Sequence, residues 1–132
     1  MIARTSRLSR ALTVVGLVVG AAGIAILWAA GIDFPVAVPP GLVILLSGAL
    51  IVAFVRKAWA PGVGAFLGLF VIVGFLVSPE GFDNLFGQRG AAVVVGQVVQ
   101  LIGVLLAFVT GSLATWRAYR AERGSGHRAR RP

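Results

Sequence analysis

Four long apolar stretches without a single charged residue, separated by short polar or charged segments, constrain this chain more than any other feature. They cover residues 11–30, 36–55, 58–77 and 91–115. Each stretch has at least 20 residues, and an α-helix of about 20 residues crosses a hydrocarbon layer of roughly 30 Å. The pattern therefore predicts an all-α membrane protein with four transmembrane helices in an antiparallel bundle.

The composition agrees with a single membrane domain. Of the 132 residues, 58% are hydrophobic and only 12% are charged, whereas about a quarter of the residues in a soluble domain are charged. We predict a basic N-terminus at 1–10, a transmembrane domain at 11–116 and a basic, partly disordered tail at 117–132. Cysteine is absent, which excludes disulfides, thiol nucleophiles and cysteine-based metal sites.

The placement of the basic residues predicts the orientation of the chain. Eleven of the twelve precede the first stretch, separate the second from the third, or follow the fourth. Because positively charged segments stay in the cytoplasm, both termini are predicted to be cytoplasmic. The residues that we expect to contact lipid headgroups and fix this topology are Arg4, Arg7, Arg10, Arg56, Lys57, Arg117, Arg120 and Arg123.

Amino-acid usage and aromatic residues add to this membrane hypothesis. All basic residues but Lys57 are arginine, and Ala, Gly and Val are abundant, a usage that G+C-rich codons produce. We therefore expect a bacterial protein of the inner (cytoplasmic) membrane. Trp28, Trp59 and Trp116 all lie at ends of the apolar stretches, as expected for rings that favour the headgroup level.

Prolines predict an unusually short second helix. Pro39 and Pro40 follow Pro35 near the start of the second stretch, and proline is well tolerated in the first turn of a helix, where its missing N–H is harmless. A helix that begins near Pro39 has 17 residues up to Val55. That is the lower limit for spanning a membrane, so this helix should stand nearly upright or thin the bilayer locally.

Small residues form stripes that predict close helix packing. In the fourth stretch they recur every three or four positions, and the first stretch carries a matching set. The candidate packing residues are Gly96, Gly103, Ala107 and Gly111 in the fourth stretch and Gly16, Gly20 and Gly23 in the first. Such faces let two backbones approach closely. We expect the fourth helix to pack against the first or the third within one chain, with a homodimer seam as the alternative.

The most polar positions inside the stretches are two glutamines in the fourth. Gln97 and Gln100 lie three residues apart, so they should face protein, because an amide in lipid lacks hydrogen-bond partners. Thr13 and Thr110 are further polar positions. The glutamines are expected to form hydrogen bonds between helices; the alternative is that they line a path for water or a polar solute.

Ionisable groups are missing from all four stretches. Small four-helix multidrug exporters have a similar size and span count, but that family uses a glutamate in its first span, and residues 11–30 contain no carboxylate. Proton relays and ion-coupled transport depend on such groups. Because we also find no catalytic triad, paired carboxylates or metal-ligand cluster in the sequence, we expect neither an enzyme nor a cofactor or metal site.

The basic tail bears on partners. Six arginines between 117 and 132 are expected to attract anionic lipid of the inner leaflet. No aromatic platform accompanies them, so nucleic acid is not expected. Other possible partners are a second copy or another membrane protein. The sequence favours a structural or accessory membrane component of unknown activity, and the alternative is a small oligomeric transporter or a holin-like pore-forming protein.

Overall fold

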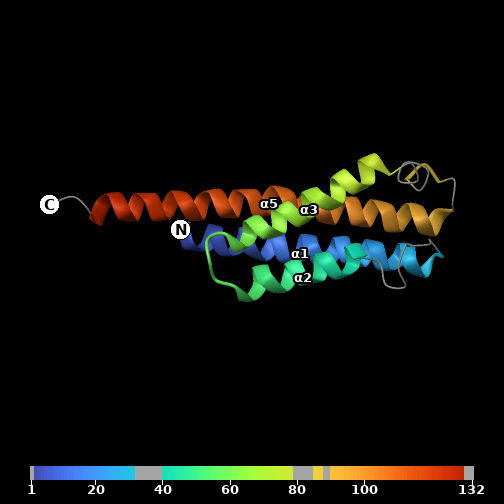
Figure 1. Ribbon diagram of the computed structural model, residues 1–132, viewed down its shortest axis with the longest axis horizontal. Helices are drawn as coiled ribbons and strands as arrows, with labels where there is room; N and C mark the ends of the chain where they lie inside the picture. The colour runs from blue at the N-terminus through green and yellow to red at the C-terminus, as the bar shows by residue number, and fades with distance from the viewer. Residues whose placement is uncertain (1, 32–39, 79–84, 88–89, 130–132) are drawn as a thin grey trace.

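The computed structural model describes residues 2–31, 40–78, 85–87 and 90–129, and these are almost entirely helical. The helices are α1 (Ile2–Ala29), α2 (Pro40–Phe54), α3 (Ala60–Val77) and α5 (Ala91–Ala129). Figure 1 shows them packed along a common long axis, with α5 projecting well beyond the others at its C-terminal end. The expectation of an all-helical protein is confirmed.

Three of the helices are long and apolar enough to cross a membrane. They are Arg7–Ala29 within α1, Ala60–Val77 and Ala91–Ala121 within α5, with mean hydropathies of 2.3, 2.3 and 2.4. These lengths and hydropathies support the prediction of a membrane protein.

The fourth helix, α2, corrects the expected span at 36–55. It has 15 residues and begins at Pro40, and a helix of that length extends about 22 Å. Proline disfavours helical geometry in the residue before it, so the Pro39-Pro40 pair accounts for the late start. Residues 32–39 lie outside the described part of the chain.

Two helices extend past the predicted boundaries. The basic segment at 1–10 is the first part of α1 from Ile2 onward, and α5 continues through the expected tail to Ala129. Extending an existing helix avoids the unfavourable nucleation step, which explains why polar residues beyond the apolar stretch continue the helix. Residues 79–84 and 88–89, between α3 and α5, lie outside the described part of the chain.

The core lies around α1, which contacts each of the other described helices, whereas α2 packs only on α1 and α3. Its centre is formed by Leu17 of α1, Leu45 and Val52 of α2, and Val104 of α5, all fully buried. Ala60, Pro61 and Gly62 follow Trp59 and start α3, with Pro61 in its first turn. The third stretch therefore begins as a helix close to its predicted start at 58.

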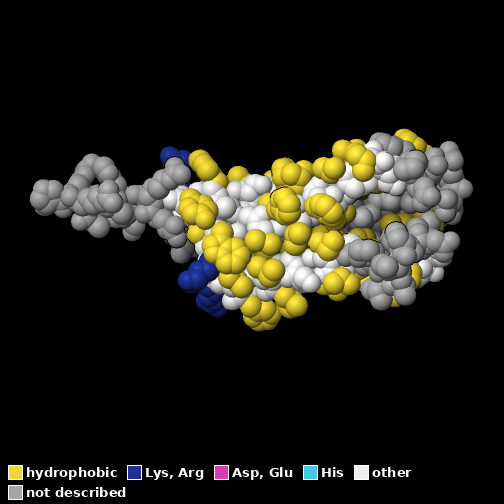
Figure 2. Space-filling view, in the orientation of Figure 1, with side chains coloured by type: hydrophobic (Ala, Val, Ile, Leu, Met, Phe, Trp, Pro, Cys, Tyr) yellow, Lys and Arg dark blue, Asp and Glu magenta, His cyan; other side chains and the backbone are white. Residues whose placement is uncertain are grey.

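The outer surface is apolar in the middle and basic at one end. Phe54 and Phe66 are 76% and 64% exposed, and Figure 2 shows hydrophobic side chains over much of the central surface, with the visible Lys and Arg side chains at one end. Exposing such an apolar surface to water is unfavourable, whereas contact with the acyl chains of lipids is not. The surface thus fits the membrane environment that the helix lengths indicate.

Candidate functional site

The candidate packing residues of α1 and α5 face one another. A Cβ atom added at Gly103 would overlap the backbone nitrogen of Gly20, and one added at Gly16 would lie 2.6 Å from the backbone nitrogen of Ala107. At Gly23, a Cβ atom would overlap the backbone nitrogen of Gln100. The two backbones therefore touch over several turns, and residue numbers rise along α1 as they fall along α5.

The same face of α5 continues onto α3. A Cβ atom at Gly111 would lie 2.6 Å from the carbonyl oxygen of Pro61, and one at Gly68 would lie 2.9 Å from the carbonyl oxygen of Val104. At Gly96, the nearest backbone atoms belong again to α1. The stripe of small residues on α5 is thus covered within one chain by α1 at one end and α3 at the other.

The side-chain amides of the two glutamines form a hydrogen bond with each other. Gln97 is only 3% exposed, and its Nε2 donates a hydrogen bond to Oε1 of Gln100 within α5. This bond lies within α5, and the expected hydrogen bond from these amides to another helix stays a prediction. Their spacing of three residues explains the bond between them, since side chains at i and i+3 on a helix are neighbours.

A hydrogen bond between helices is formed by two threonines. Thr13 and Thr110 are buried, and their hydroxyl oxygens lie 3.0 Å apart. Each hydroxyl oxygen also lies within hydrogen-bond distance of the carbonyl oxygen four residues earlier, that of Ser9 at 2.8 Å and that of Leu106 at 2.6 Å. Because a hydroxyl has one proton, one threonine donates to the other, and the second donates to its own carbonyl. Local hydrogen bonds of this kind satisfy a hydroxyl inside a helix, and the threonines form a polar link between α1 and α5.

Ser9 extends this polar link toward the basic end. Its hydroxyl accepts a hydrogen bond of 3.3 Å from Nη1 of Arg117 on α5, although Ser9 itself is buried. Sequence analysis did not single out Ser9, and the spacing of the two residues, 108 positions, carries no local signal. At the basic end of the α1–α5 interface, the guanidinium of Arg117 thus forms a hydrogen bond from α5 to α1.

Arg10 holds the end of α2 against α1. Its Nη1 donates to the carbonyl oxygens of Val52 at 3.1 Å and Val55 at 2.6 Å, and its Nη2 donates to that of Lys57 at 3.0 Å. The last carbonyls of a helix have no partners within the helix, and a positive charge is favourable there. Arg10 therefore acts as a cap for α2 that comes from a different helix.

The other candidate headgroup residues lie around the same end. Arg7, Arg56 and Lys57 are exposed, and Arg120 lies over the ring of Trp116 at 5.1 Å. The side chains of Arg4 and Arg123 lie outside the described part of the structure. Headgroup contact and topology stay predictions for all of these residues.

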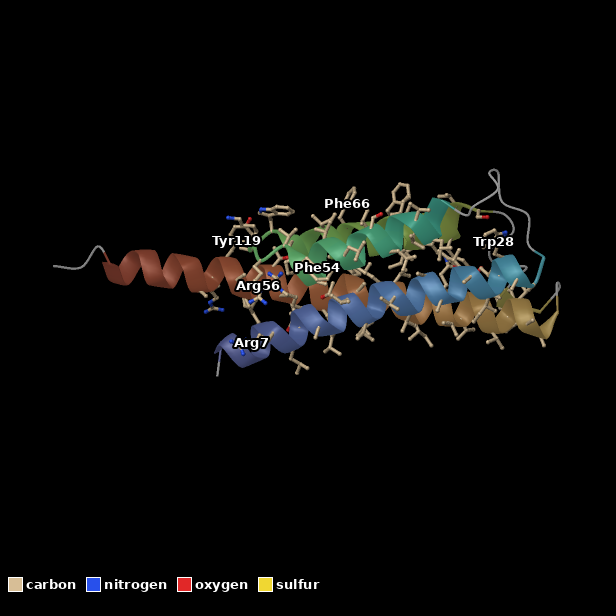
Figure 3. All side chains as sticks on the ribbon, turned by 90° about the horizontal axis from the view of Figure 1, so that it is seen from below. Arg7, Trp28, Phe54, Arg56, Phe66 and Tyr119 are labelled. Atoms are coloured by element: carbon tan, nitrogen blue, oxygen red, sulfur yellow. The ribbon has the colours of Figure 1, made fainter. Side chains whose placement is uncertain are left out.

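Aromatic residues lie toward both ends of the bundle. Trp59, Trp116 and Tyr119 are exposed, and Figure 3 places Tyr119 and Arg56 toward one end and Trp28 toward the other. In α1, Trp28 follows Arg10 by 18 positions, which correspond to about 27 Å of helix. This matches the thickness of a hydrocarbon core, roughly 30 Å.

A groove opens between α1 and the C-terminal end of α2. Its lining residues are Arg7, Arg10, Ala11, Val14, Val15, Ala53 and Arg56. Three of these are arginines and the rest are small or medium apolar residues. No cluster of three His, Cys, Asp or Glu side chains occurs within the described residues. The groove is a candidate binding site because it combines arginines with an apolar lining.

The chain matches no protein-family model, no curated protein and no solved structure. The arrangement of its own residues is therefore the basis for a proposed function.

Proposed function

We propose that this chain is a small multi-pass protein of the cytoplasmic membrane that serves as a structural or accessory component and not as an enzyme. Its four helices form an antiparallel transmembrane bundle with both termini in the cytoplasm. The exposed hydrophobic side chains of the central surface, here called the apolar belt, and the basic residues gathered at one end (Figure 2) support this arrangement. The short helix α2 stands within a bilayer that is locally thinned around it.

The single observation that carries the structural role is the contact between α1 and α5. Where a transporter needs a polar passage, the backbones of Gly16, Gly20 and Gly103 lie against each other. The hydroxyl groups of Thr13 and Thr110 are buried there. Their protons are used in the hydrogen bond between them and in a bond to a backbone carbonyl of α1 or α5. A path for ions or polar solutes would require polar groups that line it, and the hydroxyls of Thr13 and Thr110 are engaged in these hydrogen bonds instead.

The orientation is tested with single cysteines, because the natural chain has none. We expect a membrane-impermeant maleimide added to intact cells to label Ser78→Cys but neither Thr5→Cys nor Ser125→Cys. After the membrane is permeabilised, all three should react. Labelling of one tail from outside, with the other protected, would contradict the proposed topology.

The structural role is tested by flux. Purified protein in liposomes should pass ions and small polar solutes no faster than empty liposomes, because the helices close against each other. Measurable flux that is lost in Gln97→Leu would favour the alternative of a small oligomeric transporter or pore. Growth arrest and membrane depolarisation on expression would favour a holin-like activity.

A further inference from the structure

The groove between α1 and α2 combines a charged mouth with an apolar wall. It has a volume of about 840 Å³. Arg7 and Arg10 come from α1, and Arg56 comes from the segment just after α2. Figure 3 shows Arg7 and Arg56 at the same end of the bundle on neighbouring segments. The groove thus gathers three guanidinium groups where the apolar belt ends.

The positive charge of the groove is not matched by its own lining. None of the seven lining residues is acidic, and the described residues contain no ion pair with Arg7, Arg10 or Arg56. The guanidinium of Arg10 is held in place by three backbone carbonyls, which satisfy N–H groups without neutralising the charge. A guanidinium has five N–H donors, so two of them stay available to a further acceptor.

The apolar wall leads from the arginines toward the middle of the bundle. Ala11, Val15 and Ala53 line it and are exposed. Toward the middle of the bundle, Val18 follows Val15 by three residues in α1 and Leu50 precedes Ala53 by three in α2. Their side chains are 45% and 60% exposed. The small side chains at the mouth leave room for a chain of methylene groups, and the next turn offers it an apolar surface.

We propose that this groove binds an anionic phospholipid, with its phosphate among Arg7, Arg10 and Arg56 and an acyl chain along Ala11, Val15 and Ala53. Arginine binds phosphate through paired N–H donors, and basic pockets between transmembrane helices suit phosphate headgroups. A soluble anion would use the arginines but not the apolar wall. The proposal rests on the membrane location proposed above and on the basic end lying at the headgroups.

The test is lipid binding by the full chain in detergent, measured by native mass spectrometry with added phosphatidylglycerol or phosphatidylcholine. We expect the natural protein to bind phosphatidylglycerol at least about tenfold more tightly, because the zwitterionic lipid carries no net negative charge. The double variant Arg7→Gln/Arg56→Gln should lose roughly 30-fold in phosphatidylglycerol affinity. Arg10 is left unchanged because it also caps α2.

A charge-matched control removes two cations at the same end but outside the groove. Lys57→Gln/Arg120→Gln should keep phosphatidylglycerol affinity within about threefold, because neither side chain lines the groove and long-range attraction is screened by salt. Equal losses in the two double variants would overturn the proposal, since general attraction to the basic end would then explain binding. Equal affinity for the two lipids in the natural protein would overturn it as well.

A second variant tests the acyl chain. Ala53→Trp places a bulky ring in the groove at an exposed position of α2, so it should weaken phosphatidylglycerol binding about tenfold while circular dichroism shows an unchanged helix content. Glycerol phosphate, which shares the headgroup chemistry, should not displace the lipid at equal concentration. Displacement by glycerol phosphate, or full affinity in Ala53→Trp, would show a site for soluble phosphate and overturn lipid binding.

The membrane location is checked separately by extraction of cell membranes with alkaline carbonate. Resistance to extraction together with no selective lipid binding would reject only the groove. Release of the protein into the supernatant would reject the proposed function, whatever the native spectra show.

Discussion

The α1–α5 pair and the helix α2 are held in the bundle by different kinds of contact. Along α1 and α5, backbone meets backbone, as at Gly103 against Gly16 and Gly20. Around α2, the nearest atoms to its glycines are ends of side chains, such as Cδ1 of Leu67 beside Gly48 and Cδ1 of Ile24 beside Gly41. Backbone contacts cannot shift without moving a helix, whereas a leucine tip can rotate.

This difference separates a rigid part of the molecule from an adaptable one. In the α1–α5 pair, backbone lies against backbone at Gly16, Gly20 and Gly103, and Thr13 and Thr110 are linked by a hydrogen bond. The helix α2 is short, contacts α1 and α3 but not α5 among the described helices, and leaves a groove beside its C-terminal end. The candidate lipid site therefore lies beside side-chain contacts and not beside backbone contacts. Substitutions in the two regions should differ in their effect on the free energy of unfolding.

The largest effect is expected at Gly103. In Gly103→Val, the added side chain would meet the backbone of Gly16 and Gly20, so α1 and α5 must separate. We expect the free energy of unfolding to fall by about 3 kcal/mol, the upper part of the range for overpacked cores. Unfolding in mixed micelles with increasing dodecyl sulfate, followed by circular dichroism, measures this change.

Gly74→Val is the matched control for that substitution. A Cβ atom at Gly74 would have no neighbour within 4 Å, and Gly74 is an exposed residue of α3. The free energy of unfolding should change by no more than about 0.5 kcal/mol. Similar destabilisation in both variants would mean that valine harms these helices generally and that α1 and α5 are not in close contact.

The next largest effect is expected at Arg10, which holds α2. Arg10→Gln removes a charged donor from the carbonyls of Val52, Val55 and Lys57. Because hydrogen bonds from charged groups contribute about 1.5–3 kcal/mol, we expect a loss of about 2 kcal/mol. Hydrogen exchange should speed up at the C-terminal end of α2, while the middle of α5 stays protected.

Arg120→Gln serves as the control for Arg10→Gln. It removes a cation at the same end, but Arg120 is exposed and its described contact is the ring of Trp116. Exchange in α2 should then stay unchanged. Faster exchange throughout the bundle in Arg10→Gln would show that α2 and the α1–α5 pair open together, which would remove the distinction between them.

The sequence predicted the α1–α5 contact surfaces better than it predicted their partners. The recurrence of Gly96, Gly103 and Gly111 every seven or eight residues marks one face of a helix, which is a local property. Whether α1 or α3 covers that face depends on packing between distant segments, and the structure uses both. Likewise the prolines predicted a short second helix that begins near Pro39 and ends at Val55, and α2 is shorter by one residue at each end, from Pro40 to Phe54.

The polar contacts were harder to anticipate for the same reason. Thr13 and Thr110 are 97 residues apart, so their pairing depends on the register of two helices, which no local pattern reports. The role of Arg10 depends on where α2 ends. By contrast, the bond between Gln97 and Gln100 was accessible from their spacing alone, although we assigned these amides to contacts between helices.

A smaller effect tests the polar link within the α1–α5 pair. Thr13→Val and Thr110→Val each keep the side-chain shape and remove the hydroxyl. A double-mutant cycle on the free energy of unfolding should give a coupling of about 0.6 kcal/mol, the mean for such bonds in membranes. Strictly additive losses would mean that each hydroxyl bonds only to its own helix, through the carbonyls of Ser9 and Leu106.

The smallest effect is expected where one methyl group is added beside α2. In Gly48→Ala the new Cβ atom would lie 2.6 Å from Cδ1 of Leu67, and that side-chain end can move aside. Alanine is favoured over glycine within a helix by about 1 kcal/mol, so the gain offsets the displacement and the free energy of unfolding should change by less than about 0.5 kcal/mol. Gly103→Ala has the same gain in helix propensity, but its Cβ atom would meet the backbone of Gly20. This variant should therefore lower the free energy of unfolding. If Gly48→Ala lowers stability as much as Gly103→Ala does, side-chain ends around α2 are as immobile as backbone, and the groove beside it is no more adaptable than the α1–α5 interface.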